Sequence, residues 1–420
     1  MALISGKVTT DGKPLLLKLR DERDEYRQEL KYYKPQGDEK YGHMSVVKWG
    51  FSRKNSVFPD VIIGAGTNDI GFTISNTTVS NYNILAEATN SNIDLINYAI
   101  TRCKSLEDFE EILNNWHKIK KITTINGNFE IMDANGRLAM YEAYIPVQGA
   151  KVIWEKFDPE ESYDTDGTFL GFVVRTNDNQ WSPFRGGHVR EARLKEILKK
   201  LVLEKRLNYK TLIQEAAKDT CGDQTEELLA NKNINYNGFG SEEIKNNTDI
   251  YNFNTEGCIS KYNTRFGLVA VGSEDKEGLT IWVTLSEPDI GIFTPYFPLT
   301  RKVPMPSWAD PESTNIQVID QNSSSILNNL IAHKGKLFVY DNLKADIILG
   351  GLYAKTEVDR TINLINLKKI QEKLFPIQEQ MFENYENFMK NKYATKNKNQ
   401  LFNFSNEQIK FLIDNYPEMF

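Results

Sequence analysis

Short apolar runs separated by turn residues dominate the first part of the chain. The run Ala2–Gly6 predicts a strand, and Thr10–Pro14 predicts a hairpin turn because Gly12 tolerates a positive φ. The second strand of the hairpin is predicted at Leu15–Lys18. Similar runs predict strands at Met44–Phe51, Val61–Gly64, Phe72–Ser75, Asn128–Asp133, Leu138–Ala143, Gly171–Arg175, Phe266–Val271 and Leu279–Leu285.

Apolar residues spaced by three and four positions predict helices between these strands. The predicted helices are Asn92–Cys103, Leu106–Trp116 with Ser105 as its N-cap, His188–Lys205 and Tyr209–Lys218. Strands come in runs and helices come in runs, so we expect antiparallel sheets covered by helix pairs and no βαβ repeat. The apolar run at its start predicts that the Ala2 strand lies inside its sheet.

The C-terminal part of the chain has a different pattern. Thr361–Lys392 carries Leu, Ile and Phe at helical spacing and is interrupted only by Pro376, which predicts one kinked helix or two helices. Asn391–Asn403 is polar and predicts a loop. We therefore expect a main domain over residues 1–355 and a helical extension over residues 356–420, packing on the core or on a partner subunit.

Composition and charge disfavour several classes of function. The chain has 420 residues, a net charge of −6 and no long basic run, which disfavours a nucleic-acid-binding protein. No run of apolar residues is long enough to predict a membrane span. The three cysteines and four histidines form no CxxC motif or metal-ligand spacing, so neither a disulfide framework nor a metal site is expected.

Two local motifs invite a chemical interpretation. Gly64-Ala65-Gly66 follows an apolar run, but Asp69 stands where a dinucleotide-binding loop has its third glycine, and a strand follows instead of a helix. A glycine-rich bend between strands is therefore favoured. Cys103 and Cys258 are interpreted as core residues, since neither has a base nearby in sequence.

Several segments together resemble one family, the N-terminal-nucleophile hydrolases of the choloylglycine hydrolase, penicillin V acylase and isopenicillin N acyltransferase group. The resemblance spans roughly residues 1–300, and its segments are Ala2–Asp21, Gly66–Thr78, Asn128–Gly136 with Glu142, Val173–Asn177, His188–Arg193 and Thr280–Pro288. It implies an α+β fold, a four-layer αββα sandwich. It also implies hydrolysis of, or acyl transfer from, a small-molecule linear N-acyl amide, without a cofactor or metal.

The family's nucleophile is a Cys at the mature N-terminus, usually followed by Thr. Its own α-amino group, with a pKa near about 8, accepts the thiol proton, and the thiolate attacks the amide carbonyl. The resemblance implies a role for each matching residue. Asp21 would hold the amine, and Asn76 or Thr78 would donate a hydrogen bond to the oxyanion. Asn177 would contact the nucleophile or the substrate, and Arg190 would stabilise the charge of the site. The residues that would contact substrate are Lys18, Arg20 and Thr78, and the charge of Lys18 would also help to poise the site.

The start of the chain departs from the family pattern. Met1 falls about where the third mature residue should be, and neither Cys, Ser nor Thr stands at or near position 1. Our hypothesis is that a Cys, followed by Thr, precedes the residues shown. The alternatives are a non-catalytic ligand-binding or interaction protein on the same fold, and an unrelated α+β domain. We expect a cytoplasmic location for the chain as written, and a periplasmic or secreted one if a leader was removed. Assembly into a homo-oligomer is left open.

Overall fold

The computed structural model describes most of the chain. The described residues are 1–21, 27–49, 62–79, 91–120, 125–146, 149–178, 187–220, 252–254, 258–261, 264–273, 279–285, 288–289, 291–304, 361–391 and 396–415. Cys221, His333 and the boundary expected at residue 355 lie outside them, as do the ends of several predicted strands.

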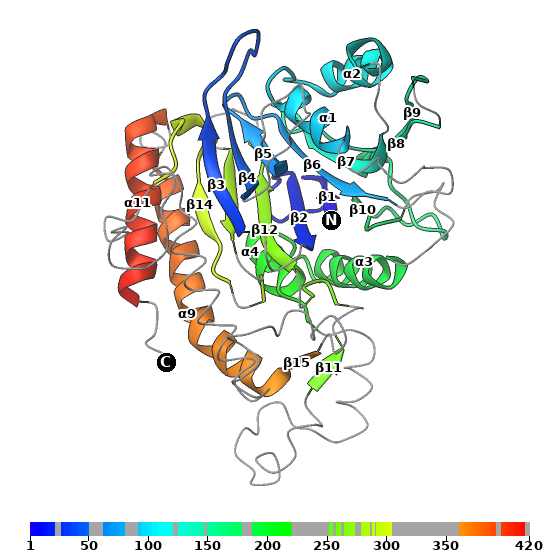
Figure 1. The fold of residues 1–420 in the computed structure, drawn as a ribbon. Coiled ribbons are helices and arrows are strands. Elements are labelled where there is room, and N and C mark those ends of the chain that lie inside the picture. Colours follow the sequence, from blue (N-terminus) through cyan, green and yellow to red (C-terminus); the bar gives the residue numbers. More distant parts are fainter. Residues whose placement is uncertain are drawn as a thin grey trace, which may run out of the picture.

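Two antiparallel sheets make up the body of the described chain (Figure 1). One has the order β10-β1-β2-β12-β13-β14, formed by Phe172–Val174, Ala2–Ile4, Leu15–Asp21, Thr264–Val271, Thr280–Thr284 and Thr294–Tyr296. The other runs in chain order from β3 to β9, formed by Arg27–Tyr33, His43–Trp49, Ile62–Asn68, Thr73–Thr78, Asn126–Met132, Leu138–Tyr144 and Ile153–Phe157. The predicted α+β class with antiparallel sheets is confirmed. The strand at Ala2 also lies inside its sheet as predicted, since it pairs with β10 on one side and β2 on the other, and its three residues are fully buried.

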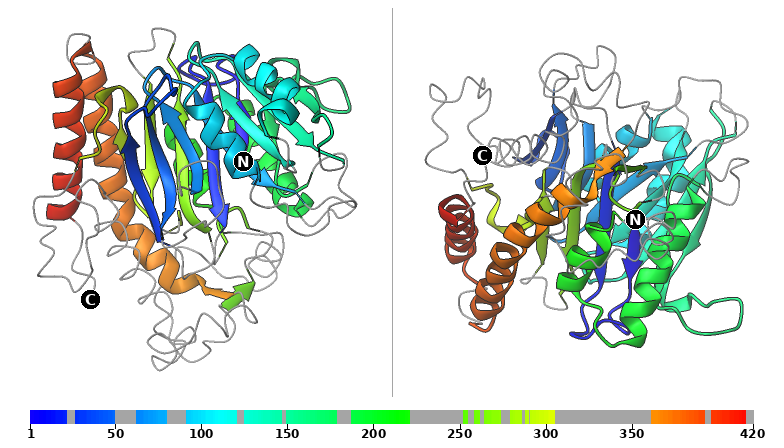
Figure 2. Two further views of the ribbon diagram at one scale, coloured as in Figure 1. Left: turned by 45° about the horizontal axis from the view of Figure 1, so that its top comes forward. Right: turned by 90° about the horizontal axis from the view of Figure 1, so that it is seen from below.

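Helices cover the sheets (Figure 2). The seven-stranded sheet packs against α1 (Ser91–Ile100) and α2 (Leu106–Ile119), and a buried cluster that includes Phe109, Trp116 and Phe129 joins them. Ser105 caps α2 with a reciprocal hydrogen-bond pair to Asp108, at the position the sequence predicts.

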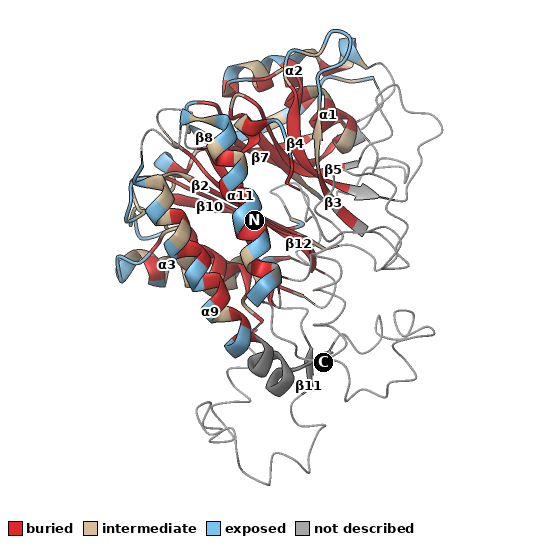
Figure 3. Ribbon diagram, turned by 90° about the vertical axis from the view of Figure 1, so that its left-hand side faces the viewer, coloured by how far each residue is buried: buried red, intermediate tan, exposed pale blue. Residues whose placement is uncertain are grey.

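A second group of helices packs on the six-stranded sheet. These are α3 (His188–Leu203), the short α4 (Tyr209–Thr211), the π-helical η3 (Leu212–Ala217), α9 (Leu364–Met389) and α11 (Lys398–Asn415). In α3, α9 and α11 the outward faces are exposed and the inward faces are buried (Figure 3). Between the sheets lies a further buried cluster, to which both sheets contribute, with Leu3 and Leu16 from one and Met44 and Met140 from the other.

The C-terminal helices are part of these cores. Tyr385 of α9 is buried against Trp282 of β13, with ring centroids 5.1 Å apart, and its hydroxyl lies 2.9 Å from Thr280 Oγ1. α9 runs through Pro376 as one helix. The loop predicted at Asn391–Asn403 is wrong from Lys398 onward, because apolar residues of α11 such as Leu401 insert into the core and outweigh the polar local sequence.

Other differences from the sequence predictions concern strands. β3, β9 and β14 were not predicted. β3 and β9 are edge strands, where a polar sequence is tolerated because one side of the strand faces solvent. Two short strands, β11 (Asn252–Asn254) and β15 (Thr361–Asn363), pair apart from both sheets, so a strand stands where the C-terminal helix was predicted to begin.

The Gly64-Ala65-Gly66 motif lies within strand β5 and does not form the predicted bend. A Cβ on Gly64 would lie 2.6 Å from Arg20 Nη1 and 2.7 Å from Phe266 Cε1. A Cβ on Gly66 would meet Ser45 Oγ at 2.0 Å. The glycines are therefore needed because side chains of the other sheet, from β2 and β12, approach Gly64, and Ser45 of the neighbouring β4 approaches Gly66.

Candidate functional site

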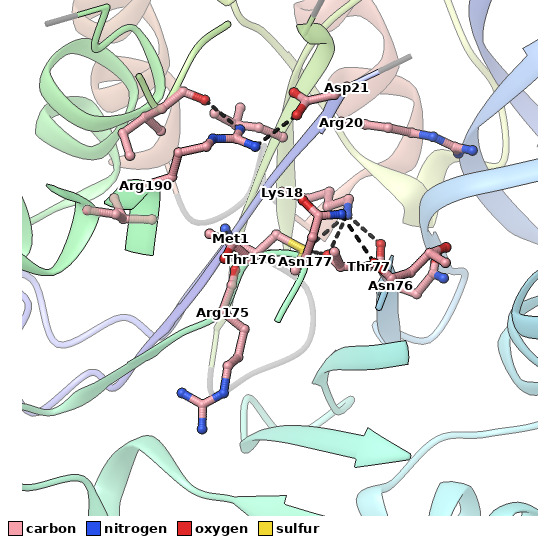
Figure 4. A pocket seen from close by; sticks show the side chains of 14 residues that line it. Met1, Lys18, Arg20, Asp21, Asn76, Thr77, Arg175, Thr176, Asn177 and Arg190 are labelled. Atoms are coloured by element: carbon pink, nitrogen blue, oxygen red, sulfur yellow. Dashed lines mark hydrogen bonds and ion pairs between the residues drawn. The ribbon is translucent and has the colours of Figure 1, made fainter. Parts of the chain in front are cut away.

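The first strand begins in a cavity of about 270 Å³ (Figure 4). Its walls come from β1, β2, β6, the segment that follows β10, and the first turn of α3. The lining residues are Met1, Lys18, Leu19, Arg20, Asp21, Asn76, Thr77, Thr78, Arg175, Thr176, Asn177, Arg190, Leu194 and Ile259. All seven residues singled out from the sequence are among them, although they come from distant parts of the chain.

Met1 is held in this cavity through its backbone and its side chain. Its amine donates to Arg175 O at 3.1 Å, and Arg175 N donates back to Met1 O at 3.1 Å. Its Sδ accepts from Lys18 Nζ at 2.9 Å and from Thr77 Oγ1 at 2.6 Å. Burial, reinforced by the charge of Lys18, lowers the pKa of the Met1 amine to about 5. This amine is therefore mostly neutral at pH 7.

Lys18 projects into the site from β2 and is almost fully buried. Its Nζ donates to Asn76 O and, at 3.3 Å, to Thr77 Oγ1. Burial lowers the pKa of Lys18, while the nearby carboxylate of Glu130 opposes that shift. Glu130 is itself fully buried, and burial raises its pKa. The negative charge of Glu130 thus favours the charged form of Lys18, and the positive charge of Lys18 favours the charged form of Glu130.

Asp21 and Arg190 form an ion pair across the mouth of the site, with Oδ2 and Nη1 2.8 Å apart. The other oxygen of Asp21 accepts from Thr264 Oγ1 at 2.7 Å, and Lys261 Nζ lies 3.3 Å from Oδ2. Burial alone would raise the pKa of Asp21, but the charges of Arg190 and Lys261, with the Thr264 hydrogen bond, hold it below its ordinary value. Asp21 is therefore ionised at neutral pH.

Arg190 is also fixed from its other side. Its Nε donates to Cys258 O at 2.9 Å and its Nη2 donates to Ile259 O at 3.0 Å. The guanidinium thus bridges α3, the end of β2 and the segment 258–261. The side chain of Cys258 is buried and its Sγ lies 2.8 Å from Thr220 O, which agrees with its interpretation as a core residue.

Strand alternation decides which side chains of β6 face the site. Ile74 belongs to the cluster under α1 and α2, so Asn76 and Thr78, at even spacing from it, point to that same side of the sheet. Ser75 and Thr77 point the other way, toward Lys18. Accordingly the carbonyl of Asn76, and not its side-chain amide, contacts Lys18, and the Asn76 side chain extends away from Met1 (Figure 4).

Asn177 and Arg20 lie at the rim of the cavity. Asn177 Nδ2 donates to Thr78 O at 3.1 Å, which ties the segment after β10 to the end of β6. The Arg20 guanidinium lies against Gly64 and points away from Met1 (Figure 4). Asn128 supports the same rim from below, since its Nδ2 donates to Thr176 O at 3.2 Å and Asp178 O at 2.9 Å.

The structure adds residues for which the sequence assigned no role. Thr77 and Arg175 line the cavity, and Glu130 stands behind Lys18. Thr77 could have been found from the polar alternation Thr73, Ser75, Thr77, which marks one polar face of the strand. Glu130 carries a weaker signal, as an acidic residue between the apolar Phe129 and Ile131. The resemblance implies that Asp21 holds the amine of the nucleophile. In the structure its carboxylate contacts Arg190, Lys261 and Thr264.

The arrangement combines a buried amine, two cations, an ion pair and a hydroxyl donor around the first residue. Such a site can accept a proton and stabilise a developing negative charge. The thioether of Met1 has no proton to lose and is not an acylating nucleophile. Among the described residues no group of three His, Cys, Asp or Glu side chains could hold a metal ion. Within the same residues no helix has the length and apolar character needed to cross a bilayer.

Comparisons with known proteins give only distant likenesses. Neither a family model nor a curated protein matches the chain. Among solved structures, a conjugated bile acid hydrolase variant from Clostridium perfringens has 12% identity and a TM-score of 0.32, covering 68% of this chain and 89% of its own. Penicillin V acylase from Agrobacterium tumefaciens has 11% identity and a TM-score of 0.37, covering 70% and 86%. A Caenorhabditis elegans ortholog of N-acylethanolamine-hydrolyzing acid amidase has 11% identity and a TM-score of 0.29, and the match covers 64% of this chain and 90% of the ortholog. At these values the likeness carries no argument about function.

Proposed function

We propose that this protein belongs to the amide hydrolases or acyltransferases that use an N-terminal Cys, and that the cavity around residue 1 is the catalytic site. The observation that carries the proposal is the position of the first residue. Its amine and side chain both lie in a cavity with Lys18, Arg175 and the Asp21–Arg190 pair. The substrate class is a small-molecule linear N-acyl amide.

The proposed reaction needs a Cys with a free amine at the start of β1. The neutral amine would accept the thiol proton, the thiolate would attack the amide carbonyl, and the amine leaving group would depart with a proton. Water or a second amine would then take the acyl group from sulfur. Lys18 and Thr77 face the first side chain and are the groups nearest to the developing charge, while Asp21 and Arg190 set the field at the mouth.

The proposal extends to the fold. We infer a four-layer αββα arrangement from the three buried clusters. One lies between the sheets and also takes in residues of α9 and α11, and one lies under each set of helices. The C-terminal helices are proposed as an extension of this body, with its boundary near residue 355. Their buried contacts with β13 and β14 support this proposal.

A second function has its own supporting observation. Met1 Sδ accepts from Lys18 and Thr77, so its side chain fills the space in which an acylated Cys would stand. A chain that keeps this residue would bind a small ligand at the rim of the cavity without turning it over. This is the non-catalytic alternative on the same fold.

The two functions are separated by placing the nucleophile. We would prepare the chain with Cys-Thr in place of Met1, Cys being the first residue after processing, and a matched chain with Ala-Thr there. A third form would carry Cys alone at position 1. Each would be incubated with a panel of N-acyl p-nitroanilides and N-acyl amino acids, with intact-mass detection of an acyl adduct and of released amine.

We expect an acyl adduct and turnover in at least one Cys form and neither in the Ala-Thr form. Thermal unfolding should confirm that all forms fold, because the changed residues are at the terminus. If both Cys forms fold, and their thiols neither acylate nor react faster than free cysteine, the amidase proposal is overturned. A ligand-induced rise in melting temperature for the unmodified chain would then support the binding alternative.

A further inference from the structure

A fully buried carboxylate lies behind the residue-1 cavity, on the seven-stranded sheet. Glu130 belongs to β7 and pairs in register with Ser75 of β6, so both side chains lie on the face that is turned to the other sheet. Ser75 Oγ donates to Glu130 Oε2 at 2.6 Å. Glu130 Oε1 is buried and has no hydrogen-bond partner among the described residues.

A buried carboxylate with one unsatisfied oxygen is costly unless another charge compensates it. The cation that faces Glu130 is Lys18 of the opposite sheet, whose Nζ donates to Thr77 Oγ1, the next side chain after Ser75 on the same face of β6. The Lys18 ammonium is almost fully buried as well. Among the described residues its hydrogen bonds go to neutral acceptors, the Asn76 carbonyl, the Thr77 hydroxyl and the Met1 thioether. Other charges act on Lys18 from Arg20, Arg190 and Asp21, and Asp21 is already engaged by Arg190 and Lys261.

The same sheet supports the opposite wall of the cavity in a similar way. Glu142 of β8 is fully buried, and its Oε1 lies 2.6 Å from Arg175 Nε. Arg175 is the residue whose backbone brackets Met1. Residue 1 thus lies between two cations, each facing a buried carboxylate of the seven-stranded sheet. Glu142 acts through a direct ion pair, whereas Glu130 acts on Lys18 through its charge, across the face of β6 that carries Ser75 and Thr77.

We propose that Glu130 is a positioning residue of this site, whose carboxylate, oriented by Ser75, keeps Lys18 charged and directed at the side chain of residue 1. This inference rests on the proposed function for its catalytic consequence. Without Glu130 the buried amine of Lys18 loses its compensating charge and becomes neutral at lower pH. A neutral Lys18 would stabilise neither a thiolate at residue 1 nor a developing oxyanion.

The test measures Lys18 itself before any activity. The chain as it exists, labelled with ¹³C-lysine, would be titrated by NMR, and the Lys18 Cε signal assigned with Lys18→Arg. In Glu130→Gln, which keeps the shape and a hydrogen-bonding partner for Ser75, we expect the Lys18 titration midpoint to fall by at least about one pH unit. Ser75→Ala keeps the carboxylate, so a smaller shift is expected.

Glu160→Gln serves as the matched control, because Glu160 pairs with Lys7 away from this cavity. It should leave the Lys18 titration unchanged. An unchanged Lys18 midpoint in a folded Glu130→Gln protein would overturn the proposal. If Glu130→Gln fails to fold, Glu130→Asp is used instead, because its shorter side chain moves the carboxylate away from Lys18. It must still lower the Lys18 titration midpoint, and an unchanged midpoint in this variant would also overturn the proposal.

The second readout uses the form with Cys at position 1, whose thiol takes the place of the Met1 side chain beside Lys18. Its thiol alkylation by iodoacetamide, followed against pH, should shift to higher pH in Glu130→Gln, since a neutral Lys18 no longer favours the thiolate. The two failures are distinguishable. If Lys18 titration moves but no Cys form acylates, Glu130 keeps its positioning role and the amidase proposal fails. If acylation proceeds and Lys18 does not move, Glu130 is only structural.

Discussion

Asp21 and Arg190 lie 169 positions apart in the sequence, yet their carboxylate and guanidinium meet at 2.8 Å beside the first residue. The pair joins β2 to α3 and, through the carbonyls of Cys258 and Ile259, to the segment before β12. It therefore fixes the mouth of the cavity from three directions. Its effect on stability can be measured in the chain as it stands.

Replacing Asp21 by Asn should destabilise the protein by about 3 kcal/mol at pH 7, because Arg190 and Lys261 lose their partly buried counter-charge. The pKa of Asp21 is held below its ordinary value, so its contribution is present above about pH 4 and is lost as the pH falls below that. Unfolding in guanidinium chloride, measured at pH 7 and at lower pH, should show that the difference in unfolding free energy between wild type and variant becomes smaller on acidification.

Asp164→Asn is the matched control for that series. Asp164 also forms an ion pair with α3, through Lys199, but at the surface. It should change the melting temperature little. An equal loss of stability in Asp21→Asn and Asp164→Asn would show that any ion pair to α3 has this effect, and that the buried Asp21–Arg190 pair has no special role.

The strand alternation of β6 predicts different consequences for two neighbouring threonines. Thr77→Val removes the hydroxyl that faces Lys18 and residue 1, whereas Thr78→Val makes the same change at an exposed position on the other face. In the form with Cys at position 1, Thr77→Val should slow acylation on the order of 10²-fold, as loss of an oxyanion donor does. Thr78→Val should keep nearly the full rate. Equal acylation rates for the two variants would show that the Thr77 hydroxyl has no part in the reaction.

Tyr385 tests whether the C-terminal helices are integral to the fold. Tyr385→Ala should cost about 3–5 kcal/mol, because a buried ring beside Trp282 leaves a cavity. Tyr385→Phe should cost only about 1 kcal/mol, the value of its hydrogen bond with Thr280. Exposed Glu383, two positions away on α9, supplies the control as Glu383→Ala. Chemical denaturation with a single cooperative transition would measure all three, and a small effect of Tyr385→Ala would mean that the helices dock only loosely.

Gly64 predicts a steric effect. Gly64→Ala should destabilise by about 1–3 kcal/mol, since its Cβ would lie 2.7 Å from Phe266 Cε1 and the ring must move. Combining it with Phe266→Leu, which removes part of the ring, should cost less than the sum of the two single changes. If the losses of unfolding free energy measured in urea are strictly additive, the contact between residue 64 and the ring of Phe266 is not the cause of the destabilisation.

Local sequence was sufficient to predict many elements of this fold. The hairpin turn at Asp11-Gly12 and the cap at Ser105 depend on backbone geometry and short-range hydrogen bonds, which neighbouring residues decide. The first strand is apolar at each of its positions, and burial on both faces requires that pattern, so its place inside a sheet could be predicted too. The family resemblance predicted which residues to examine, and the cavity contains all seven.

The tertiary structure alone decided how those residues are used. The polar alternation of β6 shows that Thr77 and Asn76 face opposite sides, but only the packing of α1 and α2 on one side determines which of them faces Lys18. Lys18 and Glu130 belong to different sheets, and α11 is a helix because Leu401 and its neighbours find a core. In each case the energy comes from burial between distant segments, which no local pattern contains.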